Sequence, residues 1–240
     1  MTVKSKRGWT IAAVLLALLI IVATFPMRLA LQLAGAEKSG FTAREVVGPV
    51  WWAGIGDARI GALPLGNLDA WLAPGPLLAG RAELGFSRQD ERLGLLSGRL
   101  RVGALRGVTE LNGAISMSSG IGLIPVDTVR MEGVEALFDA QGRCQSAQGR
   151  VQLMVGGTIA GLDLSRGLSG TLACRGNRAE TALVSQSGME KLVLSFDGSG
   201  AYRARLAIRV DRDPVMAAAL AALGFRAAND GFAMVSSGTF

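Results

Sequence analysis

The sequence predicts a mainly β fold: an N-terminal transmembrane helix, then an elongated, curved antiparallel β-meander sheet with one short C-terminal helix. Three observations predict this class. Residues 9–25 form an apolar run without a charge. Beyond residue 40, apolar and polar residues alternate with a period of two, which is typical of strands with one buried face. The candidate strands recur about every 10 to 12 residues, and glycine-rich turn signals separate many of them.

The apolar run from Trp9 to Phe25 follows the basic stretch Lys4-Ser-Lys-Arg7. This pattern indicates a membrane anchor with a cytoplasmic N-terminus, although the run is shorter than the roughly 20 residues of an ordinary span. We therefore expect a cytoplasmic tail over 1–8, a transmembrane anchor over 9–26 and a periplasmic β-rich domain over 27–240. The protein would then be a single-pass protein of the cell inner membrane.

A cleaved signal sequence is the alternative interpretation of the same segment. Cleavage needs small residues soon after the apolar run. The nearest such site, Ala34-Gly-Ala36, lies beyond Arg28 and far from Phe25. The spacing therefore favours an uncleaved anchor.

Cys144 and Cys174 are the two cysteines of the chain. A disulfide persists in an oxidising compartment such as the periplasm. Closing the loop between them would contribute roughly 3–4 kcal/mol by the chain-entropy model. We expect this disulfide, and the alternative is two unrelated buried thiols.

The clearest alternating run extends from Tyr202 to Val210, where arginines occupy one face and apolar residues the other. Similar runs predict further strands; they cover residues 99–102, 110–117, 150–155 and 191–196. Glycine-containing turn signals fall at 96–98, 112–113, 156–157 and 197–200.

One helix is expected near the C-terminus. Asp213 can cap it, Pro214 suits its first position, residues 216–223 favour helix, and Gly224 can end it. A second helical stretch can continue from the anchor through Met27 to Ala34.

The composition argues against an enzyme, because the chain has no histidine, the usual general base and a common metal ligand. Asp211 and Asp213 could share a cation, but no carboxylate cluster accompanies them. We expect no catalytic residue, no metal and no cofactor. The net charge of +6 includes three basic residues before the anchor, and the chain has one tyrosine, so nucleic acid is not an expected partner.

Trp51, Trp52 and Trp71 lie in glycine- and proline-rich segments that also contain Gly54 and Pro74. Such residues can close the end of a sheet as large core side chains, or lie at a membrane interface. Core packing is the favoured role, and these five residues are our candidates for a structural or interaction site.

Several short motifs appear in order along the chain. They are Phe25-Pro26, Gly48-x-x-Trp51-x-x-Gly54, Leu65-Gly-x-Leu-x-x-Trp71-x-x-Pro74, Leu77-Leu-x-Gly80, Gly170-Thr-Leu-x-Cys174-x-Gly176, Asp197-Gly198 before Tyr202, and Ala218-Ala-Leu-Ala-Ala-Leu-Gly-Phe225 with Gly238-Thr-Phe240. Together they resemble the type II secretion system protein N family. The tandem tryptophans and the longer Asp197-to-Tyr202 spacing depart from the family pattern.

The resemblance implies a bitopic inner-membrane protein with a periplasmic β-rich domain and no enzymatic site. Such a protein would be a non-enzymatic accessory component of type II secretion, a scaffold aiding export of folded proteins across the outer membrane. The implied partners are the inner-membrane protein C and the outer-membrane secretin. The family is also distantly similar to the AsmA-like group, which implies an alternative: a lipid-binding or lipid-transfer module whose apolar sheet face shields acyl chains between the two membranes.

Overall fold

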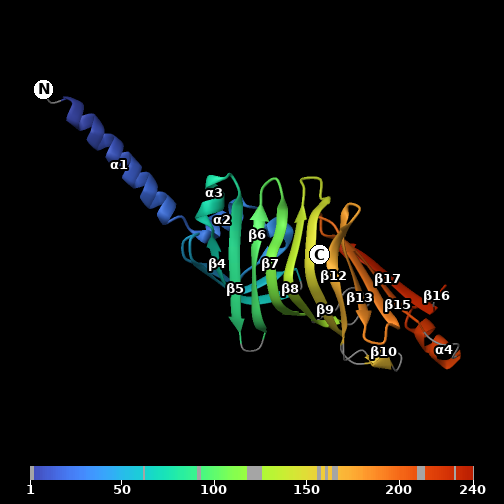
Figure 1. Cartoon of the computed structure of the whole chain (residues 1–240). Coiled ribbons are helices and arrows are strands. Elements are labelled where there is room, and N and C mark those ends of the chain that lie inside the picture. The colour runs from blue at the N-terminus through green and yellow to red at the C-terminus, as the bar shows by residue number, and fades with distance from the viewer. Residues whose placement is uncertain are drawn as a thin grey trace.

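A computed structural model of the chain describes residues 3–61, 63–90, 93–117, 126–155, 158–159, 162–163, 167–209, 214–229 and 231–239. Figure 1 shows a row of long strands between two ends. Helix α1 (Val3–Ala23) extends away from one end, and helix α4 (Pro214–Ala222) lies at the other.

Helix α1 occupies most of the segment that the sequence assigned to an anchor over 9–26. The helix ends earlier than expected because Pro26 adopts an extended conformation and bridges Pro49 of the sheet domain. Its apolar side chains from Trp9 to Val22 are exposed. Contrary to the prediction, no helix among the described residues is both long and apolar enough to cross a membrane.

Fifteen antiparallel strands form one sheet, and from β3 to β9 each strand pairs with the next in the chain. The order continues through β12, β13, β14, β15 and β17 to β16, which confirms the predicted meander. The strands are β1 (Phe41–Thr42), β2 (Glu45–Val47), β3 (Ala53–Ile60), β4 (Leu63–Leu72), β5 (Ala82–Asp90), β6 (Gly94–Val102), β7 (Arg106–Ser116), β8 (Val126–Phe138), β9 (Cys144–Val155), β12 (Leu168–Arg175), β13 (Arg178–Ser185), β14 (Glu190–Phe196), β15 (Ala201–Ile208), β16 (Arg226–Ala228) and β17 (Gly231–Thr239). A separate hairpin contains β10 (Thr158–Ile159) and β11 (Leu162–Asp163).

The two faces of the sheet differ as the alternation predicted. In β15, Leu206 and Ile208 are 1% exposed, whereas Arg203 and Arg205 are exposed. The buried residues of the other strands join them in one continuous apolar core. The predicted alternating runs lie in strands, except that Met117 and Arg209 fall just beyond the ends of β7 and β15 and Val210 lies outside the described residues.

The sheet is rolled so that its apolar face is concave. Four strand spacings separate β8 from β14, which is about 19 Å in a flat sheet. The rings of Phe138 and Phe196 on these strands nevertheless lie 6.0 Å apart. At the adjoining turns, the Gly198 N–H donates to the Gly142 carbonyl oxygen at 3.0 Å. The buried face is therefore closed by its own side chains at this end.

Two of the predicted turns are wrong, because residues 96–98 lie inside β6 and residues 112–113 inside β7. At Gly113, with φ of +123°, a Cβ atom would lie 2.1 Å from the carbonyl oxygen of Leu95. This glycine permits close approach of the neighbouring strand instead of a turn. The turn at 197–200 is confirmed between β14 and β15, and the expected turn at 156–157 lies outside the described residues.

The expected C-terminal helix is confirmed as α4, and Gly224 with φ of +90° follows it. Its predicted cap, Asp213, lies outside the described residues, as does Asp211. The stretch after the anchor forms α2 (Met27–Leu33). Two short helices were not predicted: the 3-10 helix η1 (Ala36–Ser39) and α3 (Pro74–Leu78).

Candidate interaction surfaces

Trp51 joins the end of α1 to the sheet domain. Its indole Nε1–H donates to the Val22 carbonyl oxygen at 2.9 Å. In a continuing helix this oxygen would accept from residue 26, but Pro26 has no N–H. Trp51 also packs against the buried core, and the neighbouring Val50 N–H donates to the Phe25 carbonyl oxygen at 2.8 Å. Trp51 therefore packs between the end of α1 and the sheet domain.

Trp52 and Trp71 face outward instead. Their side chains are 77% and 39% exposed. Trp52 precedes the buried Ala53 and Trp71 follows the buried Ala70, and these two alanines pair between β3 and β4. The Trp71 ring lies over Gly85 of the next strand, where a Cβ atom would come within 2.4 Å of the ring. Packing against a glycine holds this ring flat on the outer surface of the sheet.

The remaining candidates, Gly54 and Pro74, lie close to these rings in the chain and are exposed. Pro74 is the first residue of α3, a position that proline suits. This helix leaves Leu77 37% and Leu78 94% exposed. We call the set Trp52, Trp71, Leu77 and Leu78 the tryptophan end; Figure 1 shows α3 at the end of the sheet from which α1 departs.

Arg88 is a buried cation that was not among the predicted site residues. Its side chain points into the apolar core and is 2% exposed. The guanidinium donates to the carbonyl oxygens of Leu65 at 2.8 Å, Leu93 at 2.7 Å, Gly94 at 3.1 Å and Ala114 at 2.7 Å. Burial lowers the pKa of Arg88. One side chain thus joins β4, β5, β6 and β7 beneath the convex surface.

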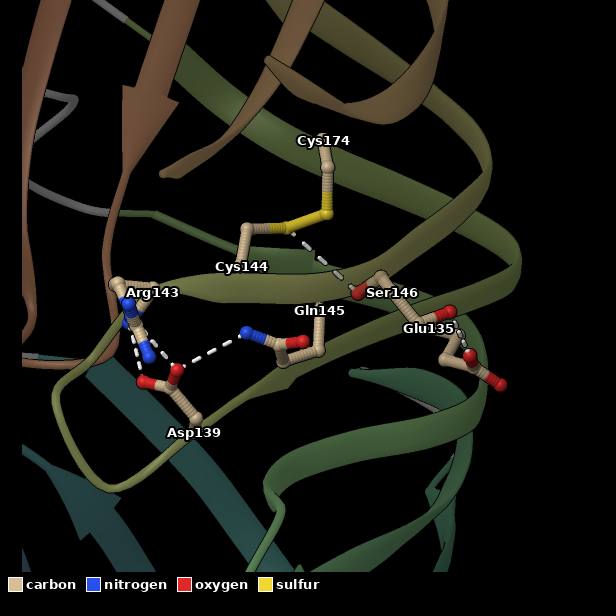
Figure 2. Close-up of a disulfide and its surroundings, with 7 residues drawn as sticks. All are labelled: Glu135, Asp139, Arg143, Cys144, Gln145, Ser146 and Cys174. Carbon is tan, nitrogen blue, oxygen red and sulfur yellow. Dashed lines mark hydrogen bonds and ion pairs between the residues drawn. A yellow bond between two sulfur atoms is a disulfide. The ribbon is translucent and has the colours of Figure 1, made fainter. Parts of the chain in front are cut away.

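The predicted disulfide is confirmed between Cys144 and Cys174, whose Cα atoms lie 5.7 Å apart (Figure 2). It connects the start of β9 to the end of β12. Residues 150–153 of β9 pair regularly with residues 168–171 of β12, but this pairing does not continue to the two cysteines. The disulfide therefore holds together a section of the sheet where the ladder is interrupted.

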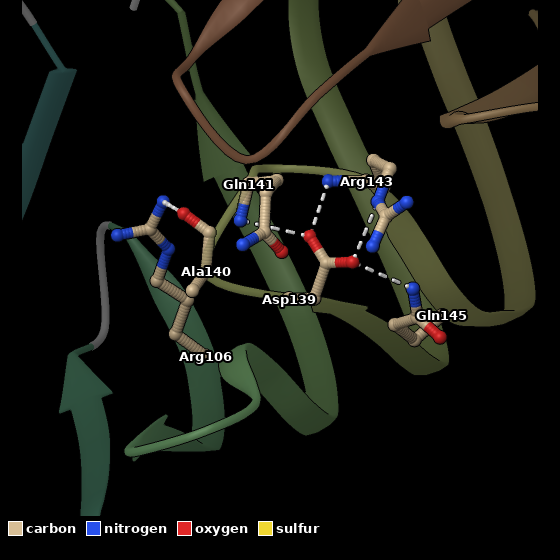
Figure 3. Close-up of polar contacts among 6 residues, drawn as sticks. All are labelled: Arg106, Asp139, Ala140, Gln141, Arg143 and Gln145. Atoms are coloured by element: carbon tan, nitrogen blue, oxygen red, sulfur yellow. Dashed lines mark hydrogen bonds and ion pairs between the residues drawn. The ribbon is translucent and has the colours of Figure 1, made fainter.

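The turn between β8 and β9 is organised by Asp139 (Figure 3). Its carboxylate accepts hydrogen bonds from the backbone N–H groups of Gln141 at 3.0 Å and Arg143 at 2.9 Å. The Arg143 Nε–H at 2.8 Å and the Gln145 amide at 3.0 Å complete the set. The Arg143 backbone N–H is the main cause of a lowered pKa at Asp139, and it outweighs the opposite effect of burial.

Asp197 has the same role in the facing turn between β14 and β15. The Ser199 hydroxyl is the main cause of its lowered pKa, and Arg178, whose Nη1 lies 3.2 Å from the carboxylate, contributes its charge. We call residues 138–144, 174–178 and 196–201 the hairpin junction. Three turns and the disulfide meet there, so it fixes the rolled shape of the sheet.

Arginines gather at the opposite end from α1. Arg203 and Arg205 of β15 and Arg226 of β16 line an open hollow of about 590 Å³, together with Ala233 and Val235 of β17. All three arginines are exposed. None of them forms an ion pair within the described residues. We call these arginines and residues 234–239 of β17 the arginine edge.

The described residues contain no group of three or more cysteine, aspartate or glutamate side chains placed to hold a metal ion. Lys191, one of the few lysines after the anchor, is exposed at the start of β14. The surfaces described above offer flat aromatic contact, an open strand edge and positive charge. Such groups suit binding to another molecule.

A family model described as type II secretion system (T2SS), protein N, matches residues 39–235. The matched span runs from η1 into β17 and contains the tryptophan end, the hairpin junction and the three arginines of the arginine edge. No curated protein and no solved structure matches the chain.

Proposed function

The chain belongs to the type II secretion system protein N family, and we propose that it is a non-enzymatic scaffold of that system, anchored in the inner membrane and extending into the periplasm. The match over residues 39–235 carries the proposal, since it covers nearly the whole sheet. Through this scaffold the protein would aid the export of folded proteins across the outer membrane. Its partners would be the inner-membrane protein C and the outer-membrane secretin.

The proposed anchor is the N-terminal segment that contains α1, although α1 does not by itself reach the length and apolarity of a membrane-crossing helix. Apolar side chains from Trp9 to Val22 are exposed all around this helix, and basic residues precede them in the sequence. An exposed apolar surface of this extent is typical of a segment that contacts a membrane or another protein. With residues 1–8 in the cytoplasm and 27–240 in the periplasm, the tryptophan end would lie near the bilayer surface, where Trp is favoured.

The form of the sheet suits a rigid support. The Cys144–Cys174 disulfide suits an oxidising compartment and strengthens the hairpin junction. The concave face of the sheet is filled by its own residues, with side chains such as Leu183 and Leu192 at most 1% exposed. This burial favours the scaffold over the lipid-handling alternative, which needs an open apolar groove.

Photo-crosslinking in living cells tests the proposal. A photoreactive amino acid is placed singly at Trp52, Trp71 and Arg205, and at Arg130, an exposed control position on β8. Mass spectrometry then identifies protein and lipid adducts. We expect adducts with secretion-system proteins from the first three positions and fewer from the control. Lipid adducts from all positions, without secretion-system proteins, would instead support the lipid-handling role.

A further inference from the structure

The two edges of the sheet differ in how much of their backbone is paired with a further strand. At the α1 end, the edge of β3 is covered: β1 pairs with residues 59–60 and β2 with residues 54–56. Between these strands the Arg44 N–H donates to the Gly56 carbonyl oxygen at 3.0 Å, so the cover is nearly continuous. At the other end, β16 pairs only with residues 231–233 of β17.

Residues 234–239 of β17 therefore have β15 on one side and no described strand on the other. An unpaired strand edge presents backbone donors and acceptors to any extended chain that approaches. Natural proteins commonly protect such an edge with charged residues on the edge strand itself. β17 carries no charged residue from Gly231 to Thr239, so it lacks this protection.

The positive charge lies beside the edge, on β15 and β16. Arg203 is opposite Ser237 and Arg205 is opposite Val235, so both side chains share the convex face with these residues of β17, and both line the hollow there. They are two residues apart on one strand, a spacing of about 6.8 Å. In a strand added to β17, every second side chain lies on the same face, and these side chains are also about 6.8 Å apart. The added strand would lie two strand spacings, or about 10 Å, from β15. Arg226 lies where such a strand would meet β16.

We propose that the arginine edge is a docking site for an extended acidic segment of a partner protein, which adds to β17 as a further strand. This inference rests on the proposed scaffold function and names the kind of partner segment that one end of the scaffold binds. Main-chain bonds to residues 234–239 would supply affinity, and carboxylates at alternate positions would pair with Arg203 and Arg205. Apolar side chains at the intervening positions would lie on the other face of the added strand, which continues the face of Met234.

A second copy of this chain fits the site less well. Two edge strands of this chain could be offered: β2, with three residues, Glu45–Val47, of which one is acidic, and β17 itself, which carries no acidic residue. An acidic segment of another protein can place carboxylates near Arg203 and Arg205 and can also be long enough to pair with all of residues 234–239.

The test uses the full chain in nanodiscs of neutral lipid. The probe is a fluorescent peptide, Gly-Ser-Val-Glu-Val-Glu-Val-Glu-Gly-Ser, and its controls replace every Glu by Gln or by Lys. Binding is followed by fluorescence anisotropy, and hydrogen exchange reports protection of residues 234–239. The variant Arg203→Gln/Arg205→Gln removes the charge pair. Arg130→Gln/Arg175→Gln is the matched control, since both arginines are exposed and form no ion pair within the described residues.

We expect the acidic peptide to bind and the Lys peptide not to bind. Binding should weaken about tenfold in Arg203→Gln/Arg205→Gln, because each exposed Arg–carboxylate pair contributes a factor of about two to five. The control variant should bind normally. Two further peptides carry N-methyl groups on alternate residues, in one phase or the other, and one of the two phases should abolish binding because it blocks the docking edge.

Three outcomes would overturn the inference. The first is absent binding, or equal binding of the acidic and Gln peptides. The second is insensitivity to both N-methyl phases. The third is a variant Arg203→Gln/Arg205→Gln that binds the peptide as well as the parent does but has lost another interaction. That interaction would be either charge-dependent binding of anionic vesicles or self-association measured by sedimentation. If peptide binding fails but crosslinks to secretion components persist, the scaffold function stands without this site. If those crosslinks fail while the peptide binds, the secretion role falls instead.

Discussion

Replacing Arg88 by methionine should destabilise the protein strongly, because the four carbonyl groups that Arg88 satisfies would remain. Hydrogen bonds from a charged donor contribute roughly 1.5–3 kcal/mol each. Four of them give about 6–12 kcal/mol, from which several kcal/mol for burying the charge must be subtracted. We therefore expect Arg88→Met to lower the free energy of unfolding by about 3–5 kcal/mol.

Arg88→Lys separates charge from geometry. An ammonium group has three donors on one nitrogen, whereas the four carbonyl groups around Arg88 surround a planar fork that spans separate strands. The lysine variant should keep the buried charge but lose about half of the hydrogen bonds, at a cost of about 3–6 kcal/mol. Arg130→Met, at an exposed position, should change stability by less than about 0.5 kcal/mol.

Urea titrations followed by tryptophan fluorescence measure all three variants. Trp51 and Trp71 lie close to the strands that Arg88 joins, so their emission reports the loss of this part of the sheet. An Arg88→Met variant as stable as the parent would contradict this prediction. That result would mean that the strands are held by side-chain packing alone and that water replaces the guanidinium at little cost.

Other predictions concern the hairpin junction. Cys144→Ala/Cys174→Ala should lower the free energy of unfolding by about 3–4 kcal/mol, and a reductant should shift the urea midpoint of the parent but not of this variant. Asp139 and Asp197 have lowered pKa values in the folded state, so their contribution to stability is present above the ordinary aspartate pKa of about 3.9 and is lost as the pH falls through the lowered values. Thermal melts from pH 7 to pH 2 should show this loss, and Asp139→Asn/Asp197→Asn should weaken the dependence. Gly198→Ala should cost about 1–3 kcal/mol, because its Cβ would lie 2.8 Å from carbon atoms of the facing turn; an unchanged melting temperature would contradict the close approach.

The strands could be predicted because alternation is a local signal. Along Tyr202–Ile208 each residue's face depends only on its position in the run, so the sequence separates arginines from apolar residues without knowledge of the neighbours. The rolling of the sheet depends on distant pairs such as Phe138 and Phe196. No local pattern in the sequence relates these two rings, and their contact follows from the sum of twists across the intervening strands.

Arg88 was missed although a signal existed. Leu84, Phe86 and Arg88 share the phase that points inward in β5, so the alternation places a charge on the buried face. An inward arginine needs several acceptors, and these come from β4, β6, β7 and the adjoining loop, which the sequence cannot bring together in advance. The glycine at 113 was misassigned for a similar reason, since a glycine that admits a neighbouring strand has the same sequence as one that forms a turn.

The open edge of β17 follows from topology more than from any motif. A meander whose first and last strands do not pair has two edges. In this sheet the first edge is covered by β1 and β2, strands of two and three residues that no alternation signals. The last edge keeps only β16, because the chain before Arg226 forms α4 and does not pair along the rest of β17. The sequence displayed the arginines of β15 on a polar face, but their place beside an unpaired strand becomes visible only when the order of the strands is known.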